Sequence, residues 1–303
     1  MITIGENIHI ISKSVREALE KKDENFIKNL IKIQQNLDCI DLNVGPAKGQ
    51  LDKIYEWLVL LCKEQNISFD STNISAIENG LSLVKNAENC FINSTSKDKE
   101  KLEKLTDVAL QYNCNLIALS MSKETGIPKT ADERLEIIFE IYEKCMEKGI
   151  ESNKLFFDPL VLPLKADQTQ AMEAINTIRM VKESFEPKVN TIIGLSNISN
   201  GIPNNLRSLV NRVYLSLCYG AGLDAVIMDA KDSELYRIIK MLDNYSPENK
   251  LDELYIKLSD SIKNFEELDE IKFDKNNLEA QNIIKTAAVL LNKKIYSDSF
   301  TQV

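Results

Sequence analysis

Eight short apolar segments alternate with longer amphipathic segments along most of the chain, and this alternation limits the possible folds more than any other feature. The apolar segments are too short and too continuous to be amphipathic helices, so we predict that they are buried β-strands. They occupy residues 2–6, 38–43, 66–70, 89–93, 115–120, 154–158, 190–195 and 224–229.

The stretches between these segments carry apolar residues at three- and four-residue spacing, as at Phe26, Leu30, Ile33 and Leu37. This spacing predicts helices that bury one face. Eight strands alternating with helices over roughly 250 residues predict an α/β fold of the closed parallel (β/α)8 TIM-barrel type. A doubly wound open sheet is the alternative. We expect residues 1–303 to form one domain.

One charged segment, residues 244–277, interrupts the alternation near the C-terminus. It is dense in Lys, Asp and Glu and contains two short amphipathic pieces, at 251–262 and 265–271. We interpret it as a solvated helical insertion, with a partner-docking element as the alternative. After it, residues 278–291 predict a helix that covers the barrel.

The charge of the chain disfavours several classes of partner. The sequence has 46 acidic and 37 basic residues, a net charge of −9, and no window clusters Lys and Arg densely. We therefore expect neither nucleic acid nor an anionic membrane as a partner. No apolar run approaches the roughly 20 residues of a membrane helix, and the N-terminus lacks the pattern of a signal peptide. We expect a cytoplasmic protein.

Cysteine and histidine usage restricts the chemistry further. Six cysteines are spaced singly with no C-x-x-C pair, which predicts buried, reduced thiols without zinc, an iron–sulfur cluster or disulfides. The one histidine, His9, rules out a His-rich metal centre and lies outside any D-x-H-x-x-G cobalt-ligating pattern. We therefore expect no metal bound by this chain. Neither a P-loop nor the dinucleotide fingerprint occurs, which argues against nucleotide binding.

Polar side chains follow every predicted strand. Any one of them could be a helix N-cap, but polar groups at all eight strand ends indicate a barrel mouth that binds a polar ligand. These residues are Glu6, Asn7, Asp41, Asn43, Asp70, Asn73, Asn93, Ser94, Ser120, Asp158, Ser196, Asn197 and Asp229.

The residue types at the strand ends indicate the kind of ligand. Carboxylates and amides dominate while Lys and Arg are scarce, which favours a neutral heterocycle rich in hydrogen-bond donors over a phosphate. A carboxylate can accept two parallel hydrogen bonds from an amino group and an adjacent ring N–H. Pterins and guanines present that edge.

Nine motifs spread over nearly the whole chain resemble those of one protein family. The chain resembles the methyltetrahydrofolate:corrinoid/iron–sulfur protein methyltransferases. They belong to the pterin-binding barrel group, with dihydropteroate synthase and the folate domain of cobalamin-dependent methionine synthase. The motifs are I-G-E-N at 4–7, D-L-N-V-G-P-A at 41–47, E-W-L-V at 56–59, D-S-T-N at 70–73, I-N-S-T at 92–95, T-G-I-P-K at 125–129, D-P-L-V-L-P at 158–163, G-L-S-N-I-S at 194–199 and G-L-D-A-V-I-M-D-A at 222–230.

The resemblance implies that the N5 methyl group of methyltetrahydrofolate is transferred to the cobalt(I) of a separate corrinoid protein. It implies that Asp70, Asn93 and Asp158 hold the pterin and that Asn197, the catalytic residue, forms a hydrogen bond to N5. The other expected substrate-binding residues are Glu6, Asp41, Ser120, Gly194, Ser196, Arg207 and Ile227. Arg207, Arg212 and Lys129 are candidate contacts of the glutamate tail.

The resemblance also implies partners. The corrinoid would be carried by the corrinoid/iron–sulfur protein of the acetyl-CoA pathway or by a corrinoid protein of the O-demethylase type, and helices late in the barrel would join a homodimer. The charged segment at 244–277 is a departure from the family. The direction of transfer and the source of the proton delivered to N5 stay open.

Two other functions fit the same barrel. One is a non-catalytic folate-binding barrel, which would keep Asp70, Asn93 and Asp158 but would not need Asn197. The other is a dihydropteroate synthase-like enzyme, which fits less well because the N-V-T-P-D-S-F-S run and the late basic K-x-R element of those enzymes are absent.

Overall fold

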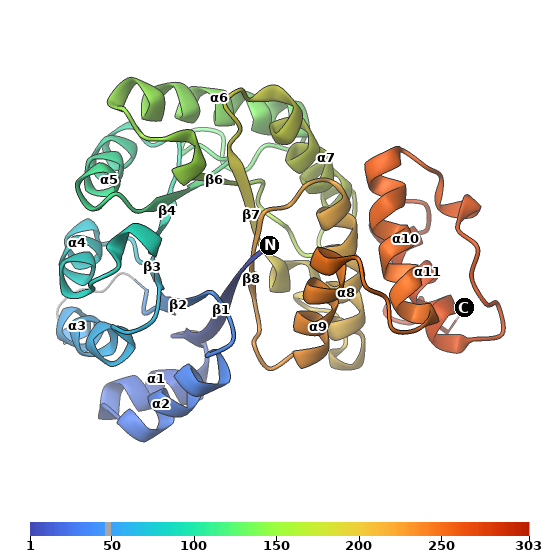
Figure 1. Ribbon diagram of the computed structural model, residues 1–303, viewed down its shortest axis with the longest axis horizontal. Helices are drawn as coiled ribbons and strands as arrows, with labels where there is room; N and C mark the ends of the chain where they lie inside the picture. Colours follow the sequence, from blue (N-terminus) through green and yellow to red (C-terminus); the bar gives the residue numbers. More distant parts are fainter. Residues whose placement is uncertain (46–49, 303) are drawn as a thin grey trace.

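The computed structural model describes residues 1–45 and 50–302, which form a closed barrel of eight parallel strands ringed by helices (Figure 1). The strands pair in chain order and β1 closes the barrel against β8. The predicted TIM barrel is confirmed, and every predicted apolar segment coincides with a strand. The strands are β1 (Ile2–His9), β2 (Cys39–Asn43), β3 (Ile67–Asp70), β4 (Phe91–Thr95), β5 (Asn115–Leu119), β6 (Leu155–Asp158), β7 (Asn190–Gly194) and β8 (Ala225–Met228).

The connections between strands are helical, and local signals set their ends. Thr130 and Glu133 form a capping box at the start of one helix, and Gly149, with a φ of 94°, ends it in the left-handed region. The helices around the barrel are α1 (Lys13–Lys21), α2 (Glu24–Ile33), α3 (Gln50–Cys62), α4 (Ile74–Leu83), α5 (Lys99–Tyr112), α6 (Ala131–Lys148), α7 (Thr169–Ser184), α8 (Asn204–Gly220) and α9 (Ser233–Asn244). Short 3-10 helices are η1 (Ala87–Asn89), η2 (Ser152–Lys154) and η3 (Leu195–Ser199).

An apolar layer fills the barrel interior, and counting along the strands from this layer shows which residues face the mouth. It consists of Ile4, Cys39, Phe91, Ile117, Phe156, Ile192 and Ala225. Because side chains alternate along a strand, the residues two positions further on face the same interior, one layer closer to the carboxyl ends. Those residues are Glu6, Asp41, Asn93, Leu119, Asp158, Gly194 and Ile227.

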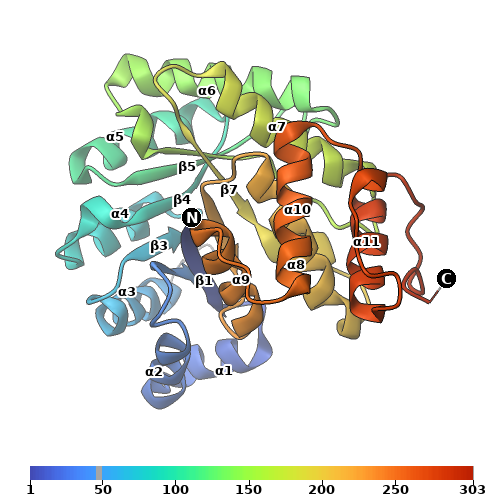
Figure 2. The ribbon, with the colours of Figure 1, turned by 45° about the vertical axis from the view of Figure 1, so that its right-hand side comes forward.

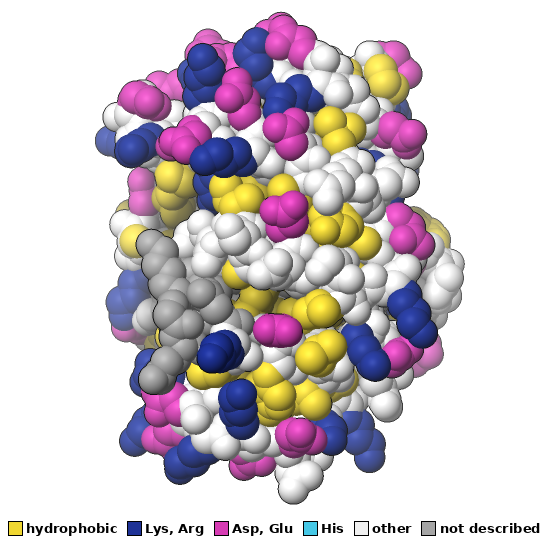
Figure 3. All heavy atoms as spheres, turned by 90° about the vertical axis from the view of Figure 1, so that its left-hand side faces the viewer, with side chains coloured by type: hydrophobic (Ala, Val, Ile, Leu, Met, Phe, Trp, Pro, Cys, Tyr) yellow, Lys and Arg dark blue, Asp and Glu magenta, His cyan; other side chains and the backbone are white. Residues whose placement is uncertain are grey.

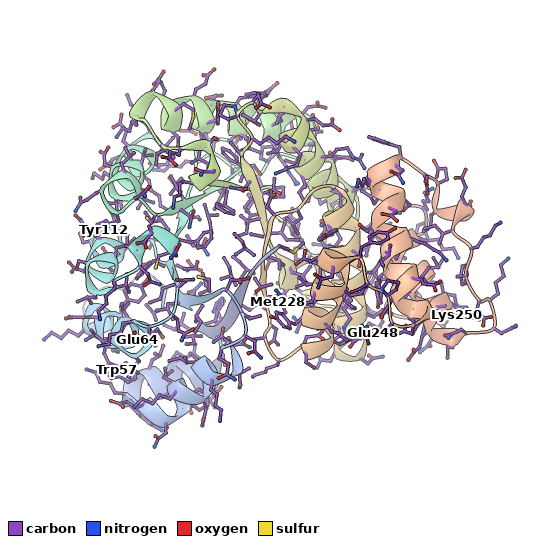
Figure 4. All side chains as sticks on the ribbon, viewed as in Figure 1. Trp57, Glu64, Tyr112, Met228, Glu248 and Lys250 are labelled. Carbon is purple, nitrogen blue, oxygen red and sulfur yellow. The ribbon has the colours of Figure 1, made fainter. Side chains whose placement is uncertain are left out.

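Two further helices, α10 (Lys250–Asn264) and α11 (Leu278–Leu290), lie outside α8, with η4 (Leu268–Glu270) between them (Figure 2). In Figure 4, Met228 at the end of β8 is in the middle of the view. Trp57 on α3 and Tyr112 on α5 are on one side of it, and Glu248 in the α9–α10 connection is on the other. The added helices therefore cover one side of the barrel only.

The C-terminal segment differs from the sequence-based expectation. Its first amphipathic piece is not a solvated insertion, because α10 buries Leu254, Tyr255, Leu258 and Ile262 against α8 and α9. The second piece forms only η4, and α11 packs on α8, α7 and α10 rather than on the strands. The physical reason lies in α8, where residues 213–218 are all buried, so this helix has apolar surface on both its inner and its outer side.

All six cysteines are buried, as predicted, and the structure pairs none of them in a disulfide. No helix in the described ranges is long and apolar enough to cross a membrane. On the face shown in Figure 3, basic and acidic side chains intermingle around the edge, while apolar and uncharged side chains gather in the middle.

Candidate functional site

Two carboxylates and three amide or hydroxyl donors form a hydrogen-bonded cluster at the carboxyl ends of β2, β3 and β4. The Oδ1 atom of Asp41 accepts hydrogen bonds from Ser68 Oγ at 2.6 Å and from Asn93 Nδ2 at 3.1 Å. The Oδ2 atom of Asp70 accepts one from Asn43 Nδ2 at 2.5 Å. Strand register explains this proximity, because Asp70 pairs with Asn43 on one side and with Asn93 on the other.

Burial dominates the electrostatics of this cluster. Burial and the neighbouring Asp70 charge raise the pKa of Asp41 well above its usual value of 3.8, and burial also raises that of Asp70. Asp41 is the more deeply buried of the two, so Asp70 is the carboxyl group that ionises more readily. An ionised Asp70 can accept hydrogen bonds from a ligand that presents donors.

Asp158 forms a second, partly buried acceptor, three strands away from Asp70 and so nearly across the barrel. Its Oδ1 atom accepts a hydrogen bond from the Leu160 backbone N–H at 2.7 Å, and the Ser120 N–H donates to its carbonyl at 3.0 Å. Burial raises the pKa of Asp158 to about 7, and the Arg134 charge opposes that rise. Ser120 itself is fully buried, and its hydroxyl has no hydrogen-bond partner among the described residues.

A third group surrounds the end of β1, where a register shift between Gly5 and Ile8 interrupts the pairing with β2. Gln34 supports this irregularity, because its Oε1 atom accepts a hydrogen bond from the Asn7 backbone N–H at 3.2 Å. The Glu6 carboxylate accepts a hydrogen bond from Ser196 Oγ at 2.5 Å. Burial, with the charges of Asp229 and Asp41, raises the pKa of Glu6.

Asn7 bridges β1 to the end of β8. Its Nδ2 atom donates to Asp229 at 2.5 Å, and its Oδ1 atom accepts from the Ala230 N–H at 2.9 Å. Adjacent residues of a regular strand point to opposite faces, whereas Glu6 and Asn7 both reach residues that follow other strands, Ser196 after β7 and Asp229 after β8. We attribute this to the bulge.

Asn197 lies on η3 directly after β7 and is exposed to solvent. Its Nδ2 atom stands 3.0 Å from the position that a Cβ atom on Gly194 would occupy, so the amide lies over the glycine. Its Oδ1 atom accepts a long hydrogen bond, 3.4 Å, from Asn200. The Asn197 side chain is therefore available to a ligand at the mouth.

The remaining predicted residues have mixed outcomes. Ile227 is partly buried and packs against the apolar layer below the mouth. Arg207 is half-buried, donates to Ser199 Oγ at 3.4 Å, and its charge lowers the pKa of Glu6. Arg212 instead pairs with Asp232 at 2.5 Å, and Lys129 is exposed.

One predicted strand-end residue is a helix cap, and two residues of the quoted motifs lie outside the described residues. The Asn73 side chain accepts from the Ala76 N–H at 3.4 Å, so it caps α4, as the helix-cap interpretation allows. The last two residues of the D-L-N-V-G-P-A motif, Pro46 and Ala47, lie outside the described residues.

Three polar residues near the mouth carried no sequence signal. Lys101 on α5 is partly buried, and its charge acts against the rise that burial causes in the pKa of Asp70. Tyr55 on α3 is 1% exposed, and its hydroxyl has no partner among the described residues. Arg134 on α6 is fully buried near Asp158. Such residues are usually surface groups or core aromatics, so sequence spacing alone did not single them out.

The site offers acceptors and amides rather than metal ligands. Within residues 1–45 and 50–302, no group of three or more His, Cys, Asp or Glu side chains is arranged to hold a metal ion. The arrangement suits a flat ligand with donor edges, held between the partly buried carboxylates of Asp70 and Asp158, with Asn197 at the solvent side.

Comparisons with known proteins agree with this chemistry. The model of the pterin binding enzyme family matches residues 43–229. The chain is 25% identical over 264 residues to the methylcorrinoid:tetrahydrofolate methyltransferase of Eubacterium limosum, covering 85% of this chain and 95% of that protein. It is 28% identical over 248 residues to the methionine synthase of Mycobacterium leprae, covering 76% of this chain but only 20% of that longer protein.

Solved structures show the same fold at low identity. A dihydropteroate synthase from Coxiella burnetii in complex with pteroic acid aligns with a TM-score of 0.59 at 12% identity, covering 81% of this chain and 94% of that one. A Yersinia pestis dihydropteroate synthase with a pterine-sulfa conjugate aligns with a TM-score of 0.54 at 14% identity, covering 80% and 94%.

Proposed function

The chain belongs to the pterin-binding enzyme family, and from this premise we propose that it transfers the N5 methyl group between methyltetrahydrofolate and the cobalt of a separate corrinoid protein. The observation that carries the proposal is the pair of partly buried acceptors, Asp70 and Asp158, with the exposed amide of Asn197 at the same end of the barrel. The relatives named for methylcorrinoid and methionine chemistry support it.

The pterin would lie between the two carboxylates. Its amino group and adjacent ring N–H are donors, and an ionised carboxylate accepts both in parallel. Asn93 can serve the mixed donor and acceptor atoms of the ring, because its amide carries both kinds of group. Phosphate or other anionic ligands fit poorly beside an ionised Asp70, whose charge would repel them.

Methyl transfer from a tertiary amine needs help at the leaving nitrogen. The methyl group leaves N5 without its bonding electron pair and bonds to cobalt(I), which is oxidised to methylcobalt(III), and N5 keeps the pair and takes up a proton. Asn197 can accept a hydrogen bond from the protonated nitrogen through its carbonyl oxygen, but a neutral amide cannot supply the proton. A preorganised hydrogen bond of this kind contributes about 2 to 4 kcal/mol to the transition state.

The direction of transfer does not change the role of the residues, because forward and reverse reactions share one transition state. The name of the Eubacterium limosum relative places the methyl group on the corrinoid and the folate as acceptor. We propose that this chain uses the same pair of substrates, and assays in both directions decide the direction.

The acceptor cobalt must come within about 3 to 3.5 Å of the methyl carbon, so the mouth has to admit a corrinoid protein. An exposed Asn197 fits this requirement. We propose a corrinoid protein as partner, either the iron–sulfur type of acetyl-CoA synthesis or the O-demethylase type. A homodimer contact through α8 would have to form over α10 and α11, which cover that helix.

A spectrophotometric assay tests the proposal. The protein, methyltetrahydrofolate and cob(I)alamin are mixed under anaerobic conditions, and the cob(I)alamin absorbance is followed; we expect its loss, with methylcobalamin and tetrahydrofolate formed in equal amounts. A folate-binding barrel without catalysis would bind the folate and leave cob(I)alamin unchanged. A dihydropteroate synthase-like enzyme would instead consume a pterin pyrophosphate and p-aminobenzoate in a parallel assay.

A further inference from the structure

Arg134, in the first turn of α6, is a buried cation whose bonded partners are both neutral. It is 0% exposed. Its Nε atom donates to the Pro128 carbonyl at 3.1 Å, and its Nη2 atom donates to the Gln170 side-chain oxygen at 2.5 Å. Its Nη1 atom is buried and has no acceptor among the described residues. Burying a guanidinium is costly unless negative charge nearby compensates it.

The compensating charges come from two elements: Arg134 interacts electrostatically with Asp158 at the end of β6 and with Glu173 on α7. Tyr214 on α8 also belongs to this group, but burial raises the pKa of its phenol well above the usual value of 10, so it is neutral near pH 7. Glu173 accepts the Ala131 backbone N–H at 2.7 Å, and the Tyr214 hydroxyl donates to the Ala171 carbonyl at 3.0 Å. Asp158 is the one member of this set at the mouth of the barrel.

Arg134 also fixes the loop between β5 and α6. Besides its own bond to Pro128, its partner Gln170 donates from Nε2 to the Lys129 carbonyl at 3.0 Å. Ser122 and Gly126 close the other end of this loop through two backbone hydrogen bonds. The loop contains the T-G-I-P-K motif and starts directly after Ser120, whose N–H donates to the Asp158 carbonyl.

We propose that Arg134 is a positioning residue of the pterin site, which holds the Asp158 carboxylate as an anion and fixes the β5–α6 loop beside it. The inference rests on the proposed function and deepens it, since an anionic Asp158 is the form that accepts two hydrogen bonds from a pterin. Arg134 donates its hydrogen bonds to Pro128 and Gln170, so its charge can stabilise that form without occupying the carboxylate oxygen atoms that a ligand would use.

Loss of the Arg134 charge should change the pH at which Asp158 ionises, whereas loss of the loop contacts alone should not. Burial raises the pKa of Asp158 to about 7, and the Arg134 charge acts against this. Without that charge the carboxylate should stay protonated to higher pH. If the midpoint rises by about one pH unit, the anionic fraction at pH 7, and with it pterin affinity, falls about fivefold.

The experiment compares Arg134→Met, which removes the charge, with Arg134→Lys, which keeps it but loses the planar two-point contact. Arg179→Met is the matched control: Arg179 also donates to a backbone carbonyl, of Ile262, and contacts Phe265, away from Asp158. Two quantities are measured for each protein: the Asp158 carboxylate titration by carbon-13 NMR without ligand, and the Kd of methyltetrahydrofolate from pH 5.5 to 9.

We expect Arg134→Met to raise the Asp158 midpoint and to move the pH midpoint of binding with it, while Arg134→Lys and Arg179→Met keep both midpoints. An unmoved Asp158 midpoint in Arg134→Met, or equal weakening by both Arg134 variants at every pH, overturns the inference. Should Arg134→Met not fold, Arg134→Gln takes its place, because it also removes the charge but keeps a hydrogen-bond donor, and an unmoved Asp158 midpoint in that variant overturns the inference. The NMR arm needs no ligand, so a wild-type protein that binds no methyltetrahydrofolate refutes the proposed function separately.

Discussion

Replacing Asp158 with asparagine should stabilise the ligand-free protein while weakening its binding of folate. The asparagine side chain would keep an oxygen that can accept the Leu160 N–H, now bonded at 2.7 Å, and would remove a carboxylate that burial disfavours. On the ligand side it would turn a donor toward the donor edge of the pterin, so that two donors face each other.

The pH dependence of this effect follows from the raised pKa of Asp158, about 7 against an ordinary value of 3.8. Because the folded protein holds this proton more tightly than the unfolded chain, the carboxyl group favours folding at low pH, and that contribution is lost as the pH rises toward 7. Linkage between these two values gives a penalty about 2 kcal/mol larger at pH 8 than at pH 5.5. The asparagine variant escapes this penalty.

Thermal or urea unfolding of both proteins at the two pH values measures the stability difference, and titration calorimetry with methyltetrahydrofolate measures binding. We expect the variant to gain stability relative to wild type between pH 5.5 and pH 8, and to lose roughly tenfold or more in affinity at pH 8, since a hydrogen bond to a charged group contributes about 1.5 to 3 kcal/mol. A stability difference that is the same at both pH values would refute the burial argument. Unchanged affinity would refute the orientation of the pterin.

Three further predictions concern the mouth and the added helices. Asn197→Ala should lower kcat/KM for methyl transfer roughly a hundredfold, with a smaller change in folate Kd. It should not lower stability, because the side chain is exposed, and Asn204→Ala, which is also exposed, is the control. Equal rates for the Asn197 variant and the wild type would remove Asn197 from the mechanism. Gly220→Ala should destabilise by about 1 to 3 kcal/mol in urea unfolding, because its Cβ would lie 2.1 Å from the Ser259 carbonyl oxygen where α8 meets α10; Lys257→Ala, on the exposed side of α10, should not. Asp41→Asn should raise the melting temperature more at pH 8 than at pH 5, because the buried carboxyl group holds its proton up to about pH 8; a smaller rise at pH 8 would contradict the electrostatics of the cluster.

The buried core of α10 also limits one way of testing partner docking. Deleting residues 244–277 would remove Leu254, Tyr255 and Leu258 from the apolar contact with α8 and expose that surface to solvent. Substitutions on the exposed side of α10 are therefore the better probe. A loss of methyl transfer to a corrinoid protein, with transfer to free cobalamin unchanged, would support docking there.

The barrel and the polar mouth could be predicted from the sequence because both follow from short-range rules. Continuous apolar segments mark parallel strands buried on both faces, and the carboxyl ends of such strands meet at one end of a barrel. This reasoning brought Asp41, Asp70 and Asn93 to one edge, where the structure bonds Asn93 to Asp41 and Asn43 to Asp70 and pairs Asp70 with Asn93 in strand register. The resemblance then supplied the ligand, which strand-end chemistry had limited only to a donor-rich heterocycle.

The remaining features depend on tertiary contacts that no local pattern encodes. The bulge in β1 needs Gln34 from a helix end 27 residues away from Asn7 to accept its N–H. The placement of α10 depends on the outer face of α8 and on Gly220, which permits close approach to Ser259. From the sequence, Arg134 looks like an ordinary surface residue of a capped helix. Only the fold buries it and brings its charge near Asp158.

A crystal structure with bound methyltetrahydrofolate tests the central claim most directly. The account predicts the pterin at the carboxyl ends of the strands, with its donor edge between the carboxylates of Asp70 and Asp158 and its N5 methyl group beside Asn197 and open to solvent. A folate bound elsewhere, or bound at the mouth with N5 turned into the barrel and away from Asn197, would contradict it.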